Sequence, residues 1–159
     1  MRTRMFALIG VSLLLFAACG GDDDSTDSSQ PSTENQPAGD EAAQATVSVA
    51  NSEFGDILTD SEGATLYMFV PDENGEPTCY DDCAASWPAL EATGAPSGGD
   101  GIEGSLLGTV ERTDGATQVT YNDMPLYYFS GDKAAGDTNG QGISDIWWVV
   151  APSGDPVKN

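Results

Sequence analysis

Two cysteines in the segment CYDDCAASW, Cys79 and Cys83, are the best-defined pair of reactive side chains in this chain of 159 residues. Residues four apart on one helical turn have Cα atoms about 6 Å apart, which is within the range that a disulfide can bridge. Such a bridge restricts the unfolded chain by about 2 kcal/mol, so the pair is predicted to be a structural disulfide. Two alternatives remain open. A thiol at the start of a helix can have a lowered pKa and act as a redox pair, and copper(I) prefers sulfur ligands, which Met68 or Met124 would complete.

The chain contains no histidine. This absence excludes Ser-His-Asp triads, histidine zinc sites and the Cys-x-x-Cys-His attachment of haem. The glycine-rich segment GDTNGQG lacks the Lys-Ser/Thr ending and the strand–loop–helix context of a phosphate-binding loop. We therefore expect a protein without enzymatic activity.

Oxygen-bearing side chains in DTNGQGISD suggest one further kind of chemistry. The first, third, fifth and ninth positions of an EF-hand-like calcium loop are occupied by Asp137, Asn139, Gln141 and Asp145. The twelfth position, where a bidentate glutamate belongs, holds Trp148. The segment therefore predicts a glycine-rich turn that leads into the last strand, with a weak calcium site of about 0.1–1 mM as the alternative. No other cofactor is expected.

The chain is strongly acidic, with 26 Asp and Glu residues, five Lys and Arg residues and a formal net charge of −21. Loss of Arg2 and Arg4 with an N-terminal leader moves this charge to about −23. Such a surface repels phosphate backbones and anionic lipid, so nucleic acid is not expected as a partner. Solubility outside the cytoplasm explains the charge, and attraction of cations is the alternative.

The N-terminus reads as an export signal. Arg2 and Arg4 precede an apolar run, Met5 to Ala18, that is too short to span a bilayer, so residues 1–18 are predicted to be a signal peptide. The run ends in FAAC, which resembles the bacterial lipoprotein cleavage box, in which the cysteine becomes a diacylated N-terminus. We expect Cys19 to anchor the protein at the extracytoplasmic face of the cell membrane, because two acyl chains are what stable anchoring requires. Secretion without a lipid is the alternative.

Residues 19–45 are rich in Gly, Ser, Asp, Gln and Pro and contain almost nothing to bury. Such a segment cannot offset the entropy cost of its own ordering, so it is predicted to be a disordered acidic tether after the lipidated cysteine. The remaining residues, 46–159, have the length of one small domain.

This domain contains an internal duplication. LYMFVPD, Leu66 to Asp72, recurs sixty residues later as LYYFSGD, Leu126 to Asp132, and the same offset relates Gly55 to Gly115 and Trp87 to Trp147. Six identities in one register predict two repeats, at about 52–90 and about 111–152. The repeated motif consists of Tyr67, Phe69 and Asp72 in the first copy and of Tyr127, Phe129 and Asp132 in the second.

Each motif copy has the pattern of a core strand with its turn. Because alternate side chains of a strand share a face, Tyr67 and Phe69 are predicted to point to one side and Leu66 and Met68 to the other. The carboxylate of Asp72, like that of the second copy, is placed to accept backbone N–H groups in the turn. An aromatic pair that faces a ligand is the alternative.

The other elements follow from the same patterns. ATVSVAN predicts a strand from Thr46, GDILTDSEGATLYMF a hairpin, GTVERTDGATQVTYNDMPLYYF three strands joined by two turns, and DIWWVVAP a last strand of five or six residues. YDDCAASW predicts a short helix, Tyr80 to Trp87, that ends at Pro88. The expected fold is a small, mostly β antiparallel domain of two related repeats with one short helix at the cysteine pair.

These blocks together resemble the bacterial secreted-repeat lipoproteins, a family of unknown function described by a conserved Tyr-x-(Phe/Trp/Tyr)-x-x-Asp motif. The resemblance covers about Phe54 to Pro152. It implies a lipid-anchored extracytoplasmic protein and leaves its activity open. The residues favour a non-enzymatic module that binds an envelope protein, a wall glycan or a cation, and the alternative is a redox or electron-transfer accessory that uses Cys79 and Cys83.

Overall fold

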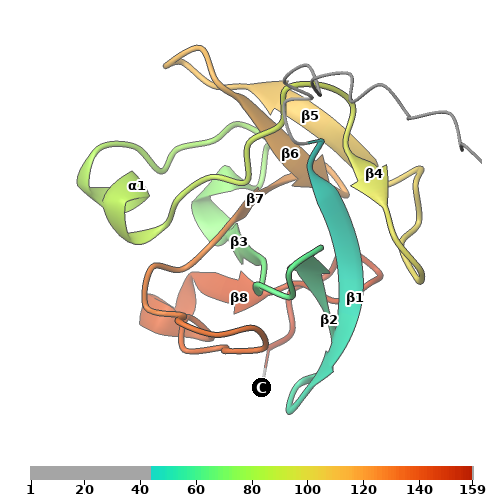
Figure 1. Cartoon of the computed structure of the whole chain (residues 1–159). Helices are drawn as coiled ribbons and strands as arrows, with labels where there is room; N and C mark the ends of the chain where they lie inside the picture. The colour runs from blue at the N-terminus through green and yellow to red at the C-terminus, as the bar shows by residue number, and fades with distance from the viewer. Residues whose placement is uncertain (1–43, 159) are drawn as a thin grey trace, which may run out of the picture. The chain divides into compact units, whose positions relative to one another are not determined.

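The computed structural model describes residues 44–158, whose elements are mostly short strands (Figure 1). In chain order they are β1 (Thr46–Ser52), β2 (Gly55–Asp60), β3 (Tyr67–Phe69), η1 (Val70–Asp72), α1 (Asp82–Ser86), β4 (Ser97–Gly98), β5 (Leu107–Glu111), β6 (Thr117–Tyr121), β7 (Met124–Tyr127), η2 (Ile143–Asp145) and β8 (Trp147–Val149). The predicted signal peptide, Cys19 and the tether up to residue 43 lie outside the described residues.

The strands form a three-stranded sheet in the order β2-β1-β4 and a five-stranded sheet in the order β5-β6-β7-β3-β8. Every pairing is antiparallel except the two-residue contact between β1 and β4. The mostly β, antiparallel fold with one short helix at the cysteine pair is therefore confirmed, and so is the three-stranded meander from β5 to β7.

The two repeats exchange strands at the centre of the five-stranded sheet. Strand β3 of the first repeat pairs with β7 of the second, with Tyr67 opposite Tyr127, and on its other side with β8, the last strand of the second repeat. The first-repeat counterpart of β8 adds to β7, because Tyr128 N donates to Pro88 O (2.8 Å) and Leu90 N donates to Leu126 O (2.9 Å). Each repeat thus supplies an edge to the central strand of the other.

Two buried clusters lie on the two faces of these central strands. Leu66, Met68 and Leu126 belong to one cluster with Val47, Leu58 and Val150. Tyr67 and Tyr127 belong to the other with Ile57, Cys79, Trp87, Trp147 and Val149. The predicted alternation of faces is confirmed, because Phe69 and Phe129 pack on the cluster that holds the tyrosines, whereas Tyr128 packs on the opposite one.

The predicted hairpin between β2 and the first motif is present, but it ends before β3. After the turn, Asp60 N donates to Ala64 O (2.9 Å), Leu66 N donates to Leu58 O (3.0 Å), and Thr59 and Thr65 form an antiparallel bridge. The next residues, β3, lie in the other sheet. The hairpin does not continue into β3 because a different segment bonds to the same edge of β2: Leu58 N donates to Val150 O (2.8 Å). Because Val150 bonds to β2 and not to β3, strand β8 has three residues instead of the predicted five or six.

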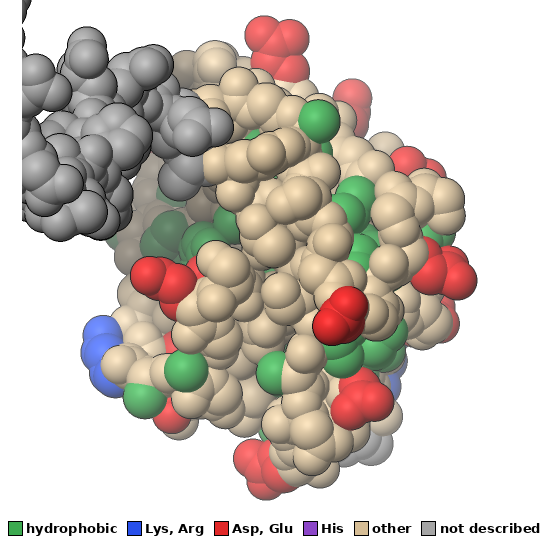
Figure 2. All heavy atoms as spheres, turned by 45° about the vertical axis from the view of Figure 1, so that its right-hand side comes forward, with side chains coloured by type: hydrophobic (Ala, Val, Ile, Leu, Met, Phe, Trp, Pro, Cys, Tyr) green, Lys and Arg blue, Asp and Glu red, His purple; other side chains and the backbone are tan. Residues whose placement is uncertain are grey.

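The surface is acidic and sparsely cationic. On the face drawn in Figure 2, Asp and Glu side chains lie in separate patches spread over the surface, and few Lys or Arg side chains appear. Within residues 44–158, no helix has the length and apolar character that crossing a membrane requires.

Strand exchange makes each repeat dependent on the other. We expect separately expressed residues 46–100 and 105–159 to remain unfolded, because each would lose the strands that pair with its central strand and bury too little apolar surface to be stable. Circular dichroism and thermal melts of each fragment, with residues 46–159 as the control, check this. Cooperative melting of either fragment alone would contradict it.

Candidate functional site

The two motif copies form a pair of crossed hydrogen bonds. Tyr67 Oη donates to Asp132 Oδ2 at 2.7 Å, and Tyr127 Oη donates to Asp72 Oδ2 at 2.5 Å. Both tyrosines are completely buried. Each motif tyrosine therefore takes its acceptor from the other repeat, which the sequence analysis did not foresee.

The second oxygen of each carboxylate organises the loop that follows it. Asp72 Oδ1 accepts the backbone N–H (2.9 Å) and the hydroxyl (2.5 Å) of Thr78, and Asp132 Oδ1 accepts the backbone N–H (2.9 Å) and the side-chain amide (3.1 Å) of Asn139. Both aspartates accept backbone N–H groups, as predicted. The donors are six and seven residues away, so the carboxylates close loops rather than tight turns.

The motif phenylalanines and the two repeated tryptophans form one stack across the repeats. Trp87 and Trp147 lie face to face at 3.8 Å with an interplanar angle of 2°. Phe69 stacks on Trp147 at 4.1 Å, and Phe129 packs on Trp87 at 4.4 Å. Aromatic contacts of this kind add about 0.5–1.5 kcal/mol beyond burial. The stack is part of the core.

Burial determines the electrostatics of the crossed pairs. It raises the pKa of Tyr67 and of Tyr127, and in each case the carboxylate partner raises the pKa further. Both hydroxyls therefore stay protonated and act as donors at neutral pH. Burial also raises the pKa of Asp72, opposed by hydrogen bonds from Thr78 and Tyr127 and by the charge of Arg112.

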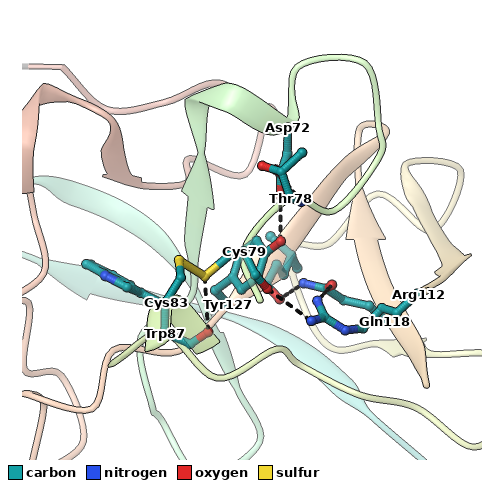
Figure 3. The surroundings of a disulfide bond; sticks show 9 residues. Asp72, Thr78, Cys79, Cys83, Trp87, Arg112, Gln118 and Tyr127 are labelled. Atoms are coloured by element: carbon teal, nitrogen blue, oxygen red, sulfur yellow. Dashed lines mark hydrogen bonds between the residues drawn. A yellow bond between two sulfur atoms is a disulfide. The ribbon is translucent and has the colours of Figure 1, made fainter. Parts of the chain in front are cut away.

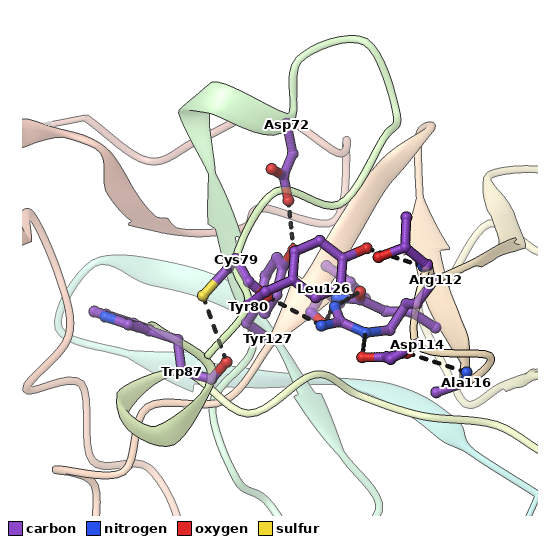
Figure 4. A network of polar contacts seen from close by, with 11 residues as sticks. Asp72, Cys79, Tyr80, Trp87, Arg112, Asp114, Ala116, Leu126 and Tyr127 are labelled. Atoms are coloured by element: carbon purple, nitrogen blue, oxygen red, sulfur yellow. Dashed lines mark hydrogen bonds and ion pairs between the residues drawn. The ribbon is translucent and has the colours of Figure 1, made fainter. Parts of the chain in front are cut away.

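Figure 4 shows the polar network around Arg112, a residue that the sequence analysis passed over. Its side chain is buried, and Nη1 donates to Gln118 Oε1 (2.7 Å) while Nη2 donates to Cys79 O (3.0 Å). Nε lies 3.2 Å from Asp114 Oδ2, and the guanidinium covers the ring of Tyr80 at 4.3 Å. A buried cation in a chain with five basic residues ties the β5–β6 turn to the cysteine loop. The small number of basic residues in the sequence was the signal that could have drawn attention to Arg112.

Cys79 and Cys83 form the predicted disulfide, with Cα atoms 5.3 Å apart (Figure 3). Cys79 is completely buried in the tyrosine cluster, and Cys83 is half-buried. Cys79 Sγ lies 3.9 Å from Trp87 O, and this is a contact because a disulfide sulfur has no proton to donate. Met68 and Met124 belong to the opposite cluster, so the structure does not bring them to the sulfur pair.

The oxygen-bearing residues of the calcium hypothesis have different surroundings, and three of them are hydrogen-bonded within the fold. Asp137 Oδ2 accepts two backbone N–H groups, and Gln141 bridges Val157 O (2.7 Å) and Val149 N (2.8 Å). Asn139 is bonded to Asp132, and Asp145 is exposed. In the described part of the chain, no group of three or more His, Cys, Asp or Glu side chains could hold a metal ion. The segment is a glycine-rich turn in which Gly142 has φ of 72°.

Reciprocal strand exchange and crossed side-chain pairs define a class of protein: a β domain made of two fused, interlocked repeats. The family described as "Secreted repeat of unknown function" matches residues 48–91 and 108–151, and the chain belongs to this family. The two matched segments begin and end sixty residues apart, in the register of the repeated motif. The family description indicates an extracytoplasmic protein. Comparison with curated proteins and with solved structures gave no match.

The crossed pairs predict a stability cost for single tyrosine changes. Tyr67→Ala and Tyr127→Ala should each destabilise the fold by about 3–5 kcal/mol, because both rings are fully buried. Tyr67→Phe and Tyr127→Phe should each cost about 1–3 kcal/mol, because a carboxylate loses its donor inside the protein. Thermal or urea unfolding measures both effects. Tyr80→Phe is the control, since its hydroxyl only accepts an exposed backbone N–H. Melting points within about 2 °C of the parent for all four variants would contradict a core role.

The raised pKa of Asp72 predicts a pH dependence of stability opposite in sign to that of an aspartate whose pKa is lowered in the folded state. Because its pKa is raised above the ordinary 3.8 in the folded state, the stability linked to its proton is present below that value and is lost as the pH rises through the folded pKa. Asp72→Asn should therefore be more destabilising at about pH 3 than at about pH 7. Asp137, whose pKa is lowered by backbone N–H bonds, provides the control, because Asp137→Asn should cost more at neutral pH. Urea unfolding at both pH values decides, and parallel trends would contradict the assignment.

Proposed function

We propose that this protein is a lipid-anchored, non-enzymatic binding module of the extracytoplasmic envelope. One observation carries the proposal: the polar and aromatic groups of both motif copies are paired with each other across the two repeats. The tyrosine hydroxyls, the carboxylate oxygens that accept from them and the facing surfaces of the two tryptophans are therefore occupied within the fold. Function is then left to the outer surface.

The charge of that surface sets the class of partner. Among residues 44–158 the exposed basic side chains are Lys133 and Lys158, because Arg112 is buried. A field of this sign attracts cationic partners, repels anionic ones and does not oppose net-neutral ones. The partners that we propose are an envelope protein with a basic surface or a wall glycan, and nucleic acid is not among them.

The anchor that we propose is a diacylated Cys19 followed by the acidic tether. Membership of a secreted-repeat family supports export, and export is the step that cleavage of the apolar leader and lipidation at the FAAC box depend on. Complete burial of Cys79, whose carbonyl accepts from the buried Arg112, supports a structural role for the disulfide, and it leaves the half-buried Cys83 as the sulfur at which the redox alternative would have to act.

The proposal predicts where the protein is found and what it retains. In its native host the full chain should partition with membranes and carry a palmitate label, whereas Cys19→Ser should appear in the medium without label but equally folded. Cross-linking of the parent in intact cells should enrich an envelope protein or wall fragment, which a Tyr127→Ala variant, unfolded by design, should not. An unlabelled parent overturns the anchor, and equal capture by the unfolded control overturns the binding role.

A further inference from the structure

Strand β5 is the terminal strand at one end of the five-stranded sheet, and its outer edge is open within the described residues (Figure 1). Just after the strand, Arg112 N donates to Ala116 O at 2.8 Å, so the even-numbered residues of this segment bond to β6. The N–H and C=O groups of the odd-numbered residues therefore point away from the sheet, and no hydrogen bond from residues 44–158 reaches them. These residues are Leu107, Thr109 and Glu111.

The other end of the same sheet, β8, is covered by the chain itself. Trp147 O accepts from Gly142 N (2.9 Å), and Val149 bonds to Val157 N through its carbonyl (3.0 Å) and to Gln141 Oε1 through its N–H (2.8 Å). Proteins usually cover an edge in this way, or mark it with Lys, Pro or a bulge, because an open edge pairs with other chains. Strand β5, LGTVE, contains neither Lys nor Pro and pairs with β6 without a bulge.

The first repeat shows what such an edge binds. Strand β1 is the counterpart of β5 in the sixty-residue register, and the start of its outer edge carries β4 as a parallel added strand. Ser97 N donates to Ala45 O (2.9 Å), and Gly99 N donates to Val47 O (2.8 Å). An extended segment is therefore held at this edge through main-chain hydrogen bonds, which is the way in which many proteins recognise peptides.

In the second repeat the corresponding acceptors have no partner. They are the carbonyls of Ser105, just before β5, and of Leu107, and neither accepts a hydrogen bond within residues 44–158. The segment that corresponds to β4 in the sixty-residue register begins at Val157, whose N–H donates to Val149 O in β8 instead. The two repeats thus have equivalent edges, and the described chain adds a strand to one of them.

The surroundings of the β5 edge determine the charge of the segment that fits it. Glu111 belongs to the strand, and Glu73 and Asp123 line a groove together with Thr109. The one basic residue of the β5–β6 hairpin, Arg112, is buried. A second copy of the chain, with its net charge of −21, and the acidic residues 19–45 are repelled from such an edge, whereas a segment rich in Lys or Arg is attracted.

We propose that the outer edge of β5 binds an extended, basic segment of an envelope protein by strand addition. The backbone of that segment supplies partners for the outward N–H and C=O groups of Leu107, Thr109 and Glu111. Main-chain pairing provides the affinity, and the acidic surroundings provide the preference for basic side chains. This inference rests on the proposed binding role and names the surface and the class of partner.

The test uses the mature chain with Cys19→Ala and two end-blocked probe peptides, one of alternating Lys and Val and one of alternating Glu and Val. The basic peptide should bind with a Kd of about 0.1–1 mM and shift the amide signals of residues 107–111. It should also slow hydrogen exchange at Thr109 and Glu111, whose N–H groups are unpaired in the free chain. The acidic peptide should bind at least about 10-fold more weakly.

Thr109→Pro removes the central outward N–H and places a ring at the edge, so it should weaken the basic peptide at least about 10-fold. The variant should fold, because proline is tolerated on an edge strand where the N–H faces solvent. Thr109→Val keeps the N–H and should bind as the parent does. Val49→Pro is the matched control, since Val49 is the counterpart of Thr109 on β1, and it should keep the peptide. Melting curves of each variant separate lost binding from lost folding.

A basic peptide that is N-methylated at every peptide bond keeps its charge but cannot donate along a strand edge, so it should not bind even to the unaltered chain. Equal binding of the methylated and unmethylated peptides would show attraction by charge alone and overturn strand addition. Slow exchange at Thr109 in the free chain would overturn it too, because a second copy or residues 19–45 would then already cover the edge.

The two proposals fail separately. Envelope capture that is unchanged in a folded Thr109→Pro variant overturns the β5 edge alone. Peptide binding at β5 without capture of an envelope protein, or with capture of wall glycan only, overturns the protein partner alone.

Discussion

The crossed donation from Tyr67 to Asp132 and from Tyr127 to Asp72 is the constraint on which the remaining architecture depends. The two tyrosines lie opposite each other in the register of β3 and β7, so both side chains originate from the interior strands of one sheet. Each carboxylate can be reached only if the loop of the opposite repeat comes across that centre. The exchanged strands join the two repeats through backbone pairing, and the Trp87–Trp147 stack joins them through side chains.

Aspartate is the residue type that this arrangement needs. Asp72 accepts from Tyr127 on one oxygen and from two groups of Thr78 on the other, so every contact requires an acceptor. An amide would present a donor to one of these three donors, and one extra methylene would displace the carboxylate from both. Since the pKa of Tyr127 is raised, its hydroxyl keeps the proton, and the direction of donation does not change at neutral pH. The nearby Arg112 offsets part of the cost of burying this charge.

Sequence reasoning reached the features that depend on local pattern. Alternation along LYMF predicts that Tyr67 and Met68 occupy opposite faces, and a spacing of four predicts the Cys79–Cys83 bridge, both of which the structure contains. It missed that Tyr67 bonds Asp132 rather than Asp72, because either partner fits the motif spacing and only the strand order decides. Arg112 was missed for a related reason: its partners at Cys79 and Gln118 are brought together by tertiary structure.

Departures from the two-fold relation mark where the repeats have separate tasks. Gly140 of the second repeat lies against Trp87 and Tyr67, and a Cβ there would approach each ring to 2.8 Å. The first repeat fills the corresponding region with the buried Cys79, whose disulfide and carbonyl engage Cys83 and Arg112. Within the described residues, the disulfide and the buried guanidinium therefore both belong to the surroundings of the first motif. The second motif, with Asp132 half-buried, holds its loop through the backbone and side-chain amide of Asn139 instead, so the two halves of the duplication close equivalent loops by different means.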